Sequence, residues 1–105
     1  MHILCRLGIT ANYAGFHYTA YAVMLAVEDP GKLQLATKWL YPEVAKYYGT
    51  TPAAVERSIR RATNTVLTYS FPRFTVIIGQ IPTVRPRTAQ FLSLLAACVP
   101  PPPAA

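Results

Sequence analysis

Two prolines and a glycine divide the middle of the chain into two helical segments joined by a tight turn. Pro42 has no amide proton and its ring clashes with a continuing helix, so it should either kink the chain or start a new helix. Gly49 is suited to closing that helix, because glycine readily adopts the left-handed conformation of a C-cap. Pro52 fits the first turn of the helix that follows. The sequence therefore predicts a short helix over residues 43–48 and a longer one over about residues 52–68.

The spacing of small and apolar residues around this turn is typical of a helix-turn-helix. The motif needs a small residue where the helices cross, a glycine at the turn, and an apolar residue of the second helix that packs on the first. Ala45, Gly49 and Val55 meet these needs in order. Thr50 or Thr51 can cap the second helix with its hydroxyl oxygen. The pattern predicts a helix-turn-helix whose second helix recognises DNA.

The second helix separates into two faces when its residues are placed about 100° apart. Its apolar residues fall within a stripe about 60° wide: Val55, Ile59, Ala62 and Val66. Its basic and amide side chains lie together on the opposite side: Arg57, Arg60, Arg61 and Asn64. One face is therefore expected to pack, and the other to meet anions and base edges.

Arginine and glutamate are suited to reading bases in the major groove. Arginine can donate two parallel hydrogen bonds to guanine, and glutamate can accept one from cytosine N4. The candidate base-reading residues lie in the first turns of the helix, where recognition helices enter the groove: Glu56, Arg57, Arg60 and Arg61. The candidate contacts to the DNA backbone lie near helix N-termini, on the same helix face or in a basic loop: Lys46, Thr50, Thr51, Asn64, Arg85 and Arg87. A solvated amphipathic helix with an arginine-rich outer face is the alternative interpretation.

The charge distribution favours a polyanionic partner. Residues 1–56 carry four basic and four acidic side chains, whereas residues 57–105 carry six arginines and no acid. The whole formal charge of +6 therefore resides in the second part of the chain. Such asymmetry points most simply to nucleic acid. The alternative interpretation of this charge is a basic protein without a polyanionic partner.

The remaining segments predict a single all-α domain. Further helices are expected at the end of 2–7 and over 15–27, 32–40 and 87–97, with a loop at 82–86. The segment 71–81 fits either a strand or a helical turn, because it is apolar and contains β-branched residues. We expect a domain of about six helices over residues 1–98, followed by a proline-rich disordered tail over 99–105.

The sequence carries no pattern typical of an enzyme, a metal site or a cofactor site. It has two histidines, and no Ser/His/Asp set, glycine-rich phosphate loop or metal-ligand spacing. Cys5 and Cys98 belong to no CxxC motif, which favours reduced thiols. The purely apolar run 20–27 is too short to span a bilayer, and no signal peptide is evident. We therefore expect a cytoplasmic, non-enzymatic protein with no cofactor, metal or membrane partner.

Several stretches also resemble a known family. Residues 41–46 (YPEVAK), 49–51 (GTT) and 55–60 (VERSIR) carry the strongest likeness, supported by 14–18 (AGFHY) and 85–92 (RPRTAQFL). Together they resemble the C-terminal effector domain of the sporulation master response regulator of endospore-forming bacteria, the sporulation initiation factor A family. Full-length members of that family also carry a receiver domain. The chain is therefore expected to be either an isolated effector domain or a stand-alone relative.

The resemblance implies an all-helical domain that binds double-stranded promoter DNA, usually as a head-to-tail pair on repeated sites. It implies that Glu56, Arg57, Arg60 and Arg61 occupy the base-contacting positions, and that RNA polymerase is a further partner. The family often carries a basic residue where this chain has Ala54. The leading hypothesis is a sequence-specific transcription regulator. The alternatives are a helical protein-interaction module that has lost DNA reading, and a non-specific binder of RNA or DNA.

Overall fold

The fold is built from helices alone over the residues that the structure describes. This computed structural model describes Leu7 and residues 14–99, so the expected helix end at 2–7, apart from Leu7, and the tail from residue 100 onward lie outside them. The elements in chain order are α2 (Ala14–Glu28), the 3-10 helix η1 (Pro30–Leu33), the π-helix η2 (Ala36–Leu40), α3 (Tyr41–Tyr48), α4 (Pro52–Tyr69), α5 (Phe71–Ile78) and α6 (Thr88–Cys98). The expected all-α class is confirmed.

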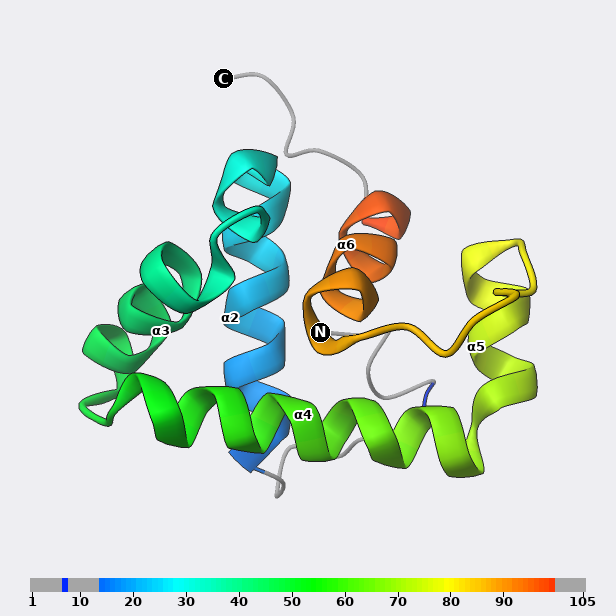
Figure 1. Cartoon of the computed structure of the whole chain (residues 1–105), viewed down its shortest axis with the longest axis horizontal. Helices are drawn as coiled ribbons and strands as arrows, with labels where there is room; N and C mark the ends of the chain where they lie inside the picture. Colours follow the sequence, from blue (N-terminus) through cyan, green and yellow to red (C-terminus); the bar gives the residue numbers. More distant parts are fainter. Residues whose placement is uncertain (1–6, 8–13, 100–105) are drawn as a thin grey trace.

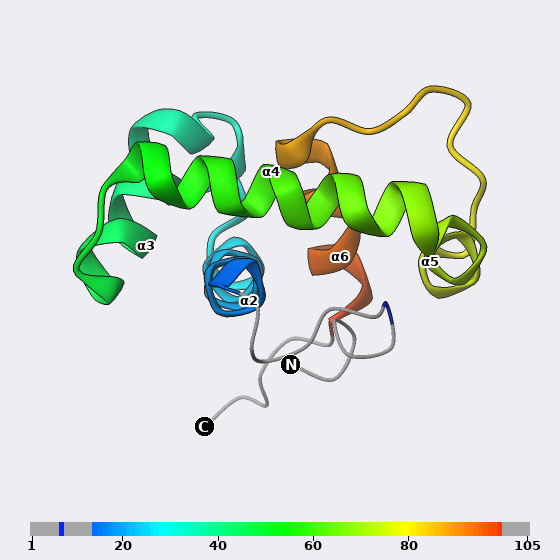
Figure 2. The ribbon, with the colours of Figure 1, turned by 90° about the horizontal axis from the view of Figure 1, so that it is seen from below.

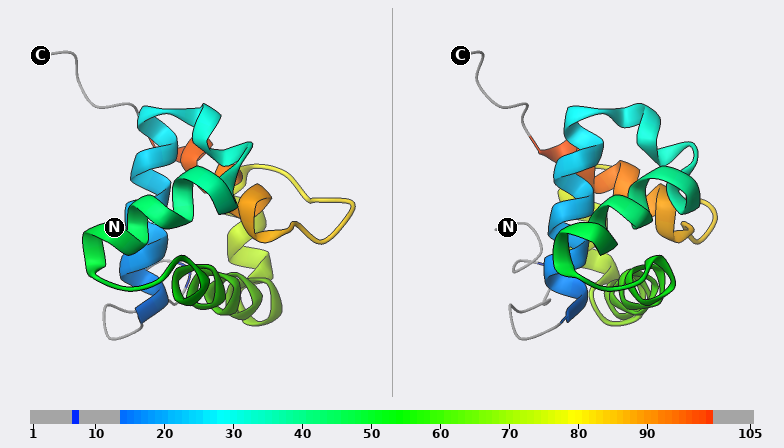
Figure 3. Two further views of the ribbon diagram at one scale, coloured as in Figure 1. Left: turned by 60° about the vertical axis from the view of Figure 1, so that its left-hand side comes forward. Right: turned by 90° about the vertical axis from the view of Figure 1, so that its left-hand side faces the viewer.

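The longest helix, α4, runs along one side of the molecule. In Figure 1 it lies horizontally below α3, α2 and α6, with α5 at its far end. Figure 2, seen from below, shows α4 crossing the front of the molecule. In the right-hand view of Figure 3, α4 is seen nearly end-on, with the other helices packed on one side of it. One face of α4 is therefore covered by the domain, and the opposite face is open to solvent.

The covered face of α4 forms the centre of the core, as the sequence predicts. Val55, Ile59, Ala62 and Val66 are all fully buried. They belong to one apolar cluster with residues of α2, α3 and α6, among them Val23, Val44 and Leu92. Thr63 is also buried, and its hydroxyl donates to the Ile59 carbonyl oxygen at 2.8 Å, which satisfies its polar group. Packing of this stripe fixes which side chains of α4 point outward.

The segment after α4 is a helix, which resolves the choice that its sequence leaves open. Phe74 of α5 is fully buried and stacks on Phe91 of α6, with ring centroids 5.3 Å apart and an interplanar angle of 22°. Gly79 closes α5 in the left-handed conformation, with φ of 73°. The predicted loop then leads to α6, whose N-cap position is Arg87.

The helix expected over 32–40 is divided into two short pieces. The amide of Tyr41 donates to the Ala36 carbonyl oxygen, a π-type bond that widens the turn just before Pro42. Ala36 and Leu40 are buried as expected for an apolar face, whereas Leu35 and Trp39 are each more than half exposed. Pro42 then occupies the first turn of α3, so it starts a new helix.

Candidate nucleic-acid interface

The turn between α3 and α4 has the geometry that its sequence predicts. Gly49 closes α3 in the left-handed conformation, with φ of 67°, and its amide donates to the Ala45 carbonyl oxygen. The amide of Thr50 donates to the same oxygen at 2.9 Å. Thr51 is the N-cap of α4, and its hydroxyl oxygen accepts from the Ala54 amide at 3.1 Å. These bonds satisfy the Ala45 carbonyl oxygen at the end of α3 and the Ala54 amide at the start of α4.

The two helices meet through small and branched apolar side chains. Ala45 is 2% exposed and Val55 is fully buried, as expected for residues at a helix crossing. Val44 and Tyr41 of α3 are buried in the same cluster. The predicted helix–turn–helix arrangement is therefore present, with α4 as its second helix.

The outer face of α4 exposes every arginine that the sequence singles out. Arg57, Arg60 and Arg61 are all exposed, and Glu56 is half-buried beside them. The Glu56 carboxylate accepts from Arg60 Nη1 at 3.2 Å, which makes an ion pair between residues one helical turn apart. Within the described part of the chain, Arg57 and Arg61 enter no ion pair. The face therefore presents two unpaired guanidinium groups and one that is held by a carboxylate.

Tyr41 of α3 is buried close enough to Glu56 for the carboxylate charge to act on it. The side chain is only 4% exposed, and burial raises the pKa of Tyr41 to about 12, with a further rise from the negative charge of Glu56. The phenol is therefore neutral at physiological pH. The sequence does not show that the Tyr41 ring lies where the negative charge of Glu56 acts on it.

The candidate backbone contacts occupy several exposed positions. Lys46 is exposed near the end of α3, Thr51 is exposed at the start of α4, and Thr50 is half-buried between them. Arg87 is exposed at the N-cap position of α6. Arg85, in the loop between α5 and α6, donates from Nη2 to Asn64 Oδ1 at 3.4 Å, so the structure brings together two residues 21 positions apart. Nothing in the sequence signals this pairing.

A group of aromatic rings joins α2 to the end of α3. Tyr21 stacks on Tyr47 with ring centroids 4.4 Å apart, and the Tyr48 hydroxyl donates to the His17 carbonyl oxygen at 3.4 Å. Partial burial, followed by the neighbouring tyrosines, raises the pKa of Tyr48. Through these contacts Tyr47 and Tyr48 pack α3 against α2.

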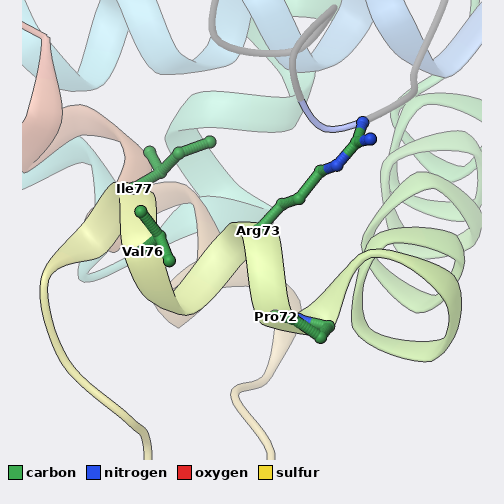
Figure 4. Close-up of a pocket in the computed structure, with 4 residues that line it drawn as sticks. All are labelled: Pro72, Arg73, Val76 and Ile77. Carbon is green, nitrogen blue, oxygen red and sulfur yellow. The ribbon is translucent and has the colours of Figure 1, made fainter.

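One cavity lies on α5, away from the arginine face of α4. Its volume is about 460 Å³, and it is lined by Pro72, Arg73, Val76 and Ile77 of α5 (Figure 4). Among the described residues that line it, Arg73 is the one cation and the others are apolar. In residues 14–99, no group of three His, Cys, Asp or Glu side chains could hold a metal ion. Over the same described range, no helix is long and apolar enough to span a membrane.

A comparison with protein families adds an independent finding. Residues 1–99 match the family model described as sporulation initiation factor Spo0A C terminal. The match extends over α2 to α6 and includes both helices around Gly49. It therefore agrees with the resemblance that the sequence motifs carry.

Proposed function

The chain belongs to the family of Spo0A C-terminal domains, and we propose that it is a sequence-specific transcription regulator that reads promoter DNA with α4. This family comprises DNA-binding effector domains of a sporulation response regulator rather than enzymes. The observation that carries the proposal is the division of α4 into a fully buried face and an arginine-rich exposed face.

In this proposal, the exposed face of α4 enters the major groove. Arg57 and Arg61 present free guanidinium groups, each able to donate two hydrogen bonds to guanine O6 and N7. Glu56 and Arg60 are adjacent on the same face and complete the base-reading set. The opposite face cannot contact DNA because it is buried in the core.

Contacts to the phosphates would fix the orientation of α4 in the groove. The proposed residues on one flank are Lys46, Thr50 and Thr51, at the end of α3 and the start of α4. Those on the other are Asn64, Arg85 and Arg87. We further propose promoter DNA in the cytoplasm as the working partner, bound by a homodimer on repeated sites, with RNA polymerase as a second partner.

A gel-shift experiment tests the proposal directly. The chain is titrated into a duplex carrying a sporulation-type promoter repeat and into a scrambled duplex of equal length, at physiological salt. We expect the repeat to shift at a markedly lower protein concentration, and both affinities to fall steeply as salt rises. Equal shifts of both duplexes would indicate a non-specific binder. No shift of either would favour the protein-interaction module.

A further inference from the structure

Glu56 is the only acidic residue that α4 contains and the last one in the chain. It stands four residues before Arg60, and its carboxylate accepts from Arg60 Nη1 at 3.2 Å. Glutamate placed N-terminal to a basic residue at this spacing is the favourable orientation for an ion pair on a helix. Arg57 and Arg61, the other arginines of the helix, have no such partner among the described residues.

The two members of the pair differ in how far they are exposed to solvent. The Glu56 side chain is 34% exposed and that of Arg60 is 54% exposed. Glu56 also lies close enough to the buried Tyr41 for its charge to raise the pKa of that phenol. The Glu56 carboxylate is therefore the more buried member of the pair, and the Arg60 guanidinium is the more exposed one.

This arrangement bears on specificity because phosphates attract arginine regardless of base sequence. A carboxylate beside one of three arginines lowers the charge of the face and competes with phosphate for that guanidinium. A guanine in the correct position can offer two aligned acceptors in place of the carboxylate. A random duplex offers the arginine mainly phosphates, which the carboxylate opposes.

We propose that Glu56 is a specificity-determining residue that acts through Arg60, restraining its guanidinium so that non-cognate DNA is bound less tightly. The inference rests on the proposed function and deepens it. It adds to direct reading of cytosine by Glu56 a second effect of the carboxylate, one that requires Arg60. In the present proposal, removal of the carboxylate strengthens binding to random DNA while it weakens discrimination.

The test uses Glu56→Gln, which removes the charge and keeps the side-chain length. Affinities for the repeat and scrambled duplexes are measured over a series of salt concentrations. We expect Glu56→Gln to bind the scrambled duplex several-fold more tightly than the wild type does. For this duplex, the slope of log K against log salt should become steeper by about 0.9. The ratio of the two affinities should fall. In an Arg60→Gln background, Glu56→Gln should lower that ratio by less than it does in the wild-type background.

Glu43→Gln is the matched control. It also removes a carboxylate from an ion pair, with Lys32 Nζ at 2.7 Å, but on α3 and η1 rather than on α4. Its affinity ratio should equal that of the wild type. The inference is overturned if Glu56→Gln leaves binding to the scrambled duplex unchanged or weaker, or if it lowers the ratio equally without Arg60. A wild-type chain that binds both duplexes alike would overturn the proposed function itself, and the inference with it.

Discussion

Arg85 donates a hydrogen bond from its guanidinium to the side-chain oxygen of Asn64, with 3.4 Å between Nη2 and Oδ1. The bond joins the loop between α5 and α6 to the exposed face of α4, beyond Arg60 and Arg61 along the helix. In Figure 1 this loop leaves α5 and returns to the start of α6 alongside α4. Arg85 is thereby held next to the face that we propose for DNA binding.

Arg85→Ala and Arg87→Ala should each weaken binding to the repeat and scrambled duplexes by similar factors. Phosphate contacts carry little sequence information, and each one lost should reduce the salt slope by about 0.9. Measuring both affinities over a salt series checks this. Arg73→Ala, which removes the same charge from α5, is the control and should leave the slope near the wild-type value. A selective loss on the repeat would instead show that the loop reads bases.

Ala45→Leu should destabilise the domain. Ala45 is 2% exposed where α3 meets α4, so a larger side chain must push the two helices apart. Overpacking of this kind typically costs about 1–3 kcal/mol, measurable by urea denaturation. Lys46→Leu, one residue later and exposed, should change the free energy of unfolding much less. Equal losses in the two variants would contradict a tight crossing at Ala45.

Gly49→Ala should lower stability through the backbone alone. Gly49 has φ of 67°, and a Cβ built on it would meet nothing within 4 Å. The penalty is therefore that of a left-handed alanine, about 1 kcal/mol. Gly49→Asn should lose less, because asparagine tolerates this conformation better. Denaturation midpoints of the two variants test the prediction, and an unchanged midpoint for Gly49→Ala would contradict it.

The free energy of unfolding should fall at alkaline pH, where Tyr41 loses its proton. Because burial and Glu56 raise the pKa of Tyr41 from 10.0 to about 12, the folded state holds its phenolic proton more tightly than the unfolded state does. The resulting stabilisation is complete below pH 10.0 and is lost as pH rises toward about 12. Tyr41→Phe should remove that part of the pH dependence.

Denaturation of the wild type and Tyr41→Phe at pH 9 and at about pH 11.5 measures the difference, which by linkage is of the order of 2 kcal/mol. Tyr69→Phe serves as the control, because Tyr69 is 81% exposed. The prediction fails if the wild type and Tyr41→Phe lose the same stability between these two conditions.

The helix-turn-helix was predictable because its determinants are local. Gly49 and Pro52 impose backbone conformations that the sequence states directly, and Val55 repeats with Ile59 and Ala62 at the period of a helix. The buried and exposed sides of α4 follow from that period. The roles of the exposed side chains in DNA binding remain predictions.

The parts that the sequence leaves open depend on contacts between distant residues. The run from Thr75 to Ile78 has the composition of a strand, and it is helical where Phe74 packs on Phe91 of α6. Met24 is 54% exposed, because α2 is apolar on nearly every side and its sequence does not mark which side packs. The bond between Asn64 and Arg85 likewise depends on how the loop returns from α5.

The central claim, that the exposed face of α4 reads bases, is tested most directly with Arg57→Ala. Arg57 is exposed and enters no ion pair among the described residues, so its removal should leave the fold intact. For Arg57→Ala, the ratio of its affinities for the repeat and the scrambled duplex is measured. This ratio is compared with those of the wild type and of Lys38→Ala, a charge-matched control on η2. We predict a loss of about 1–3 kcal/mol on the repeat, with a much smaller loss on the scrambled duplex. A wild-type ratio in Arg57→Ala would contradict the account.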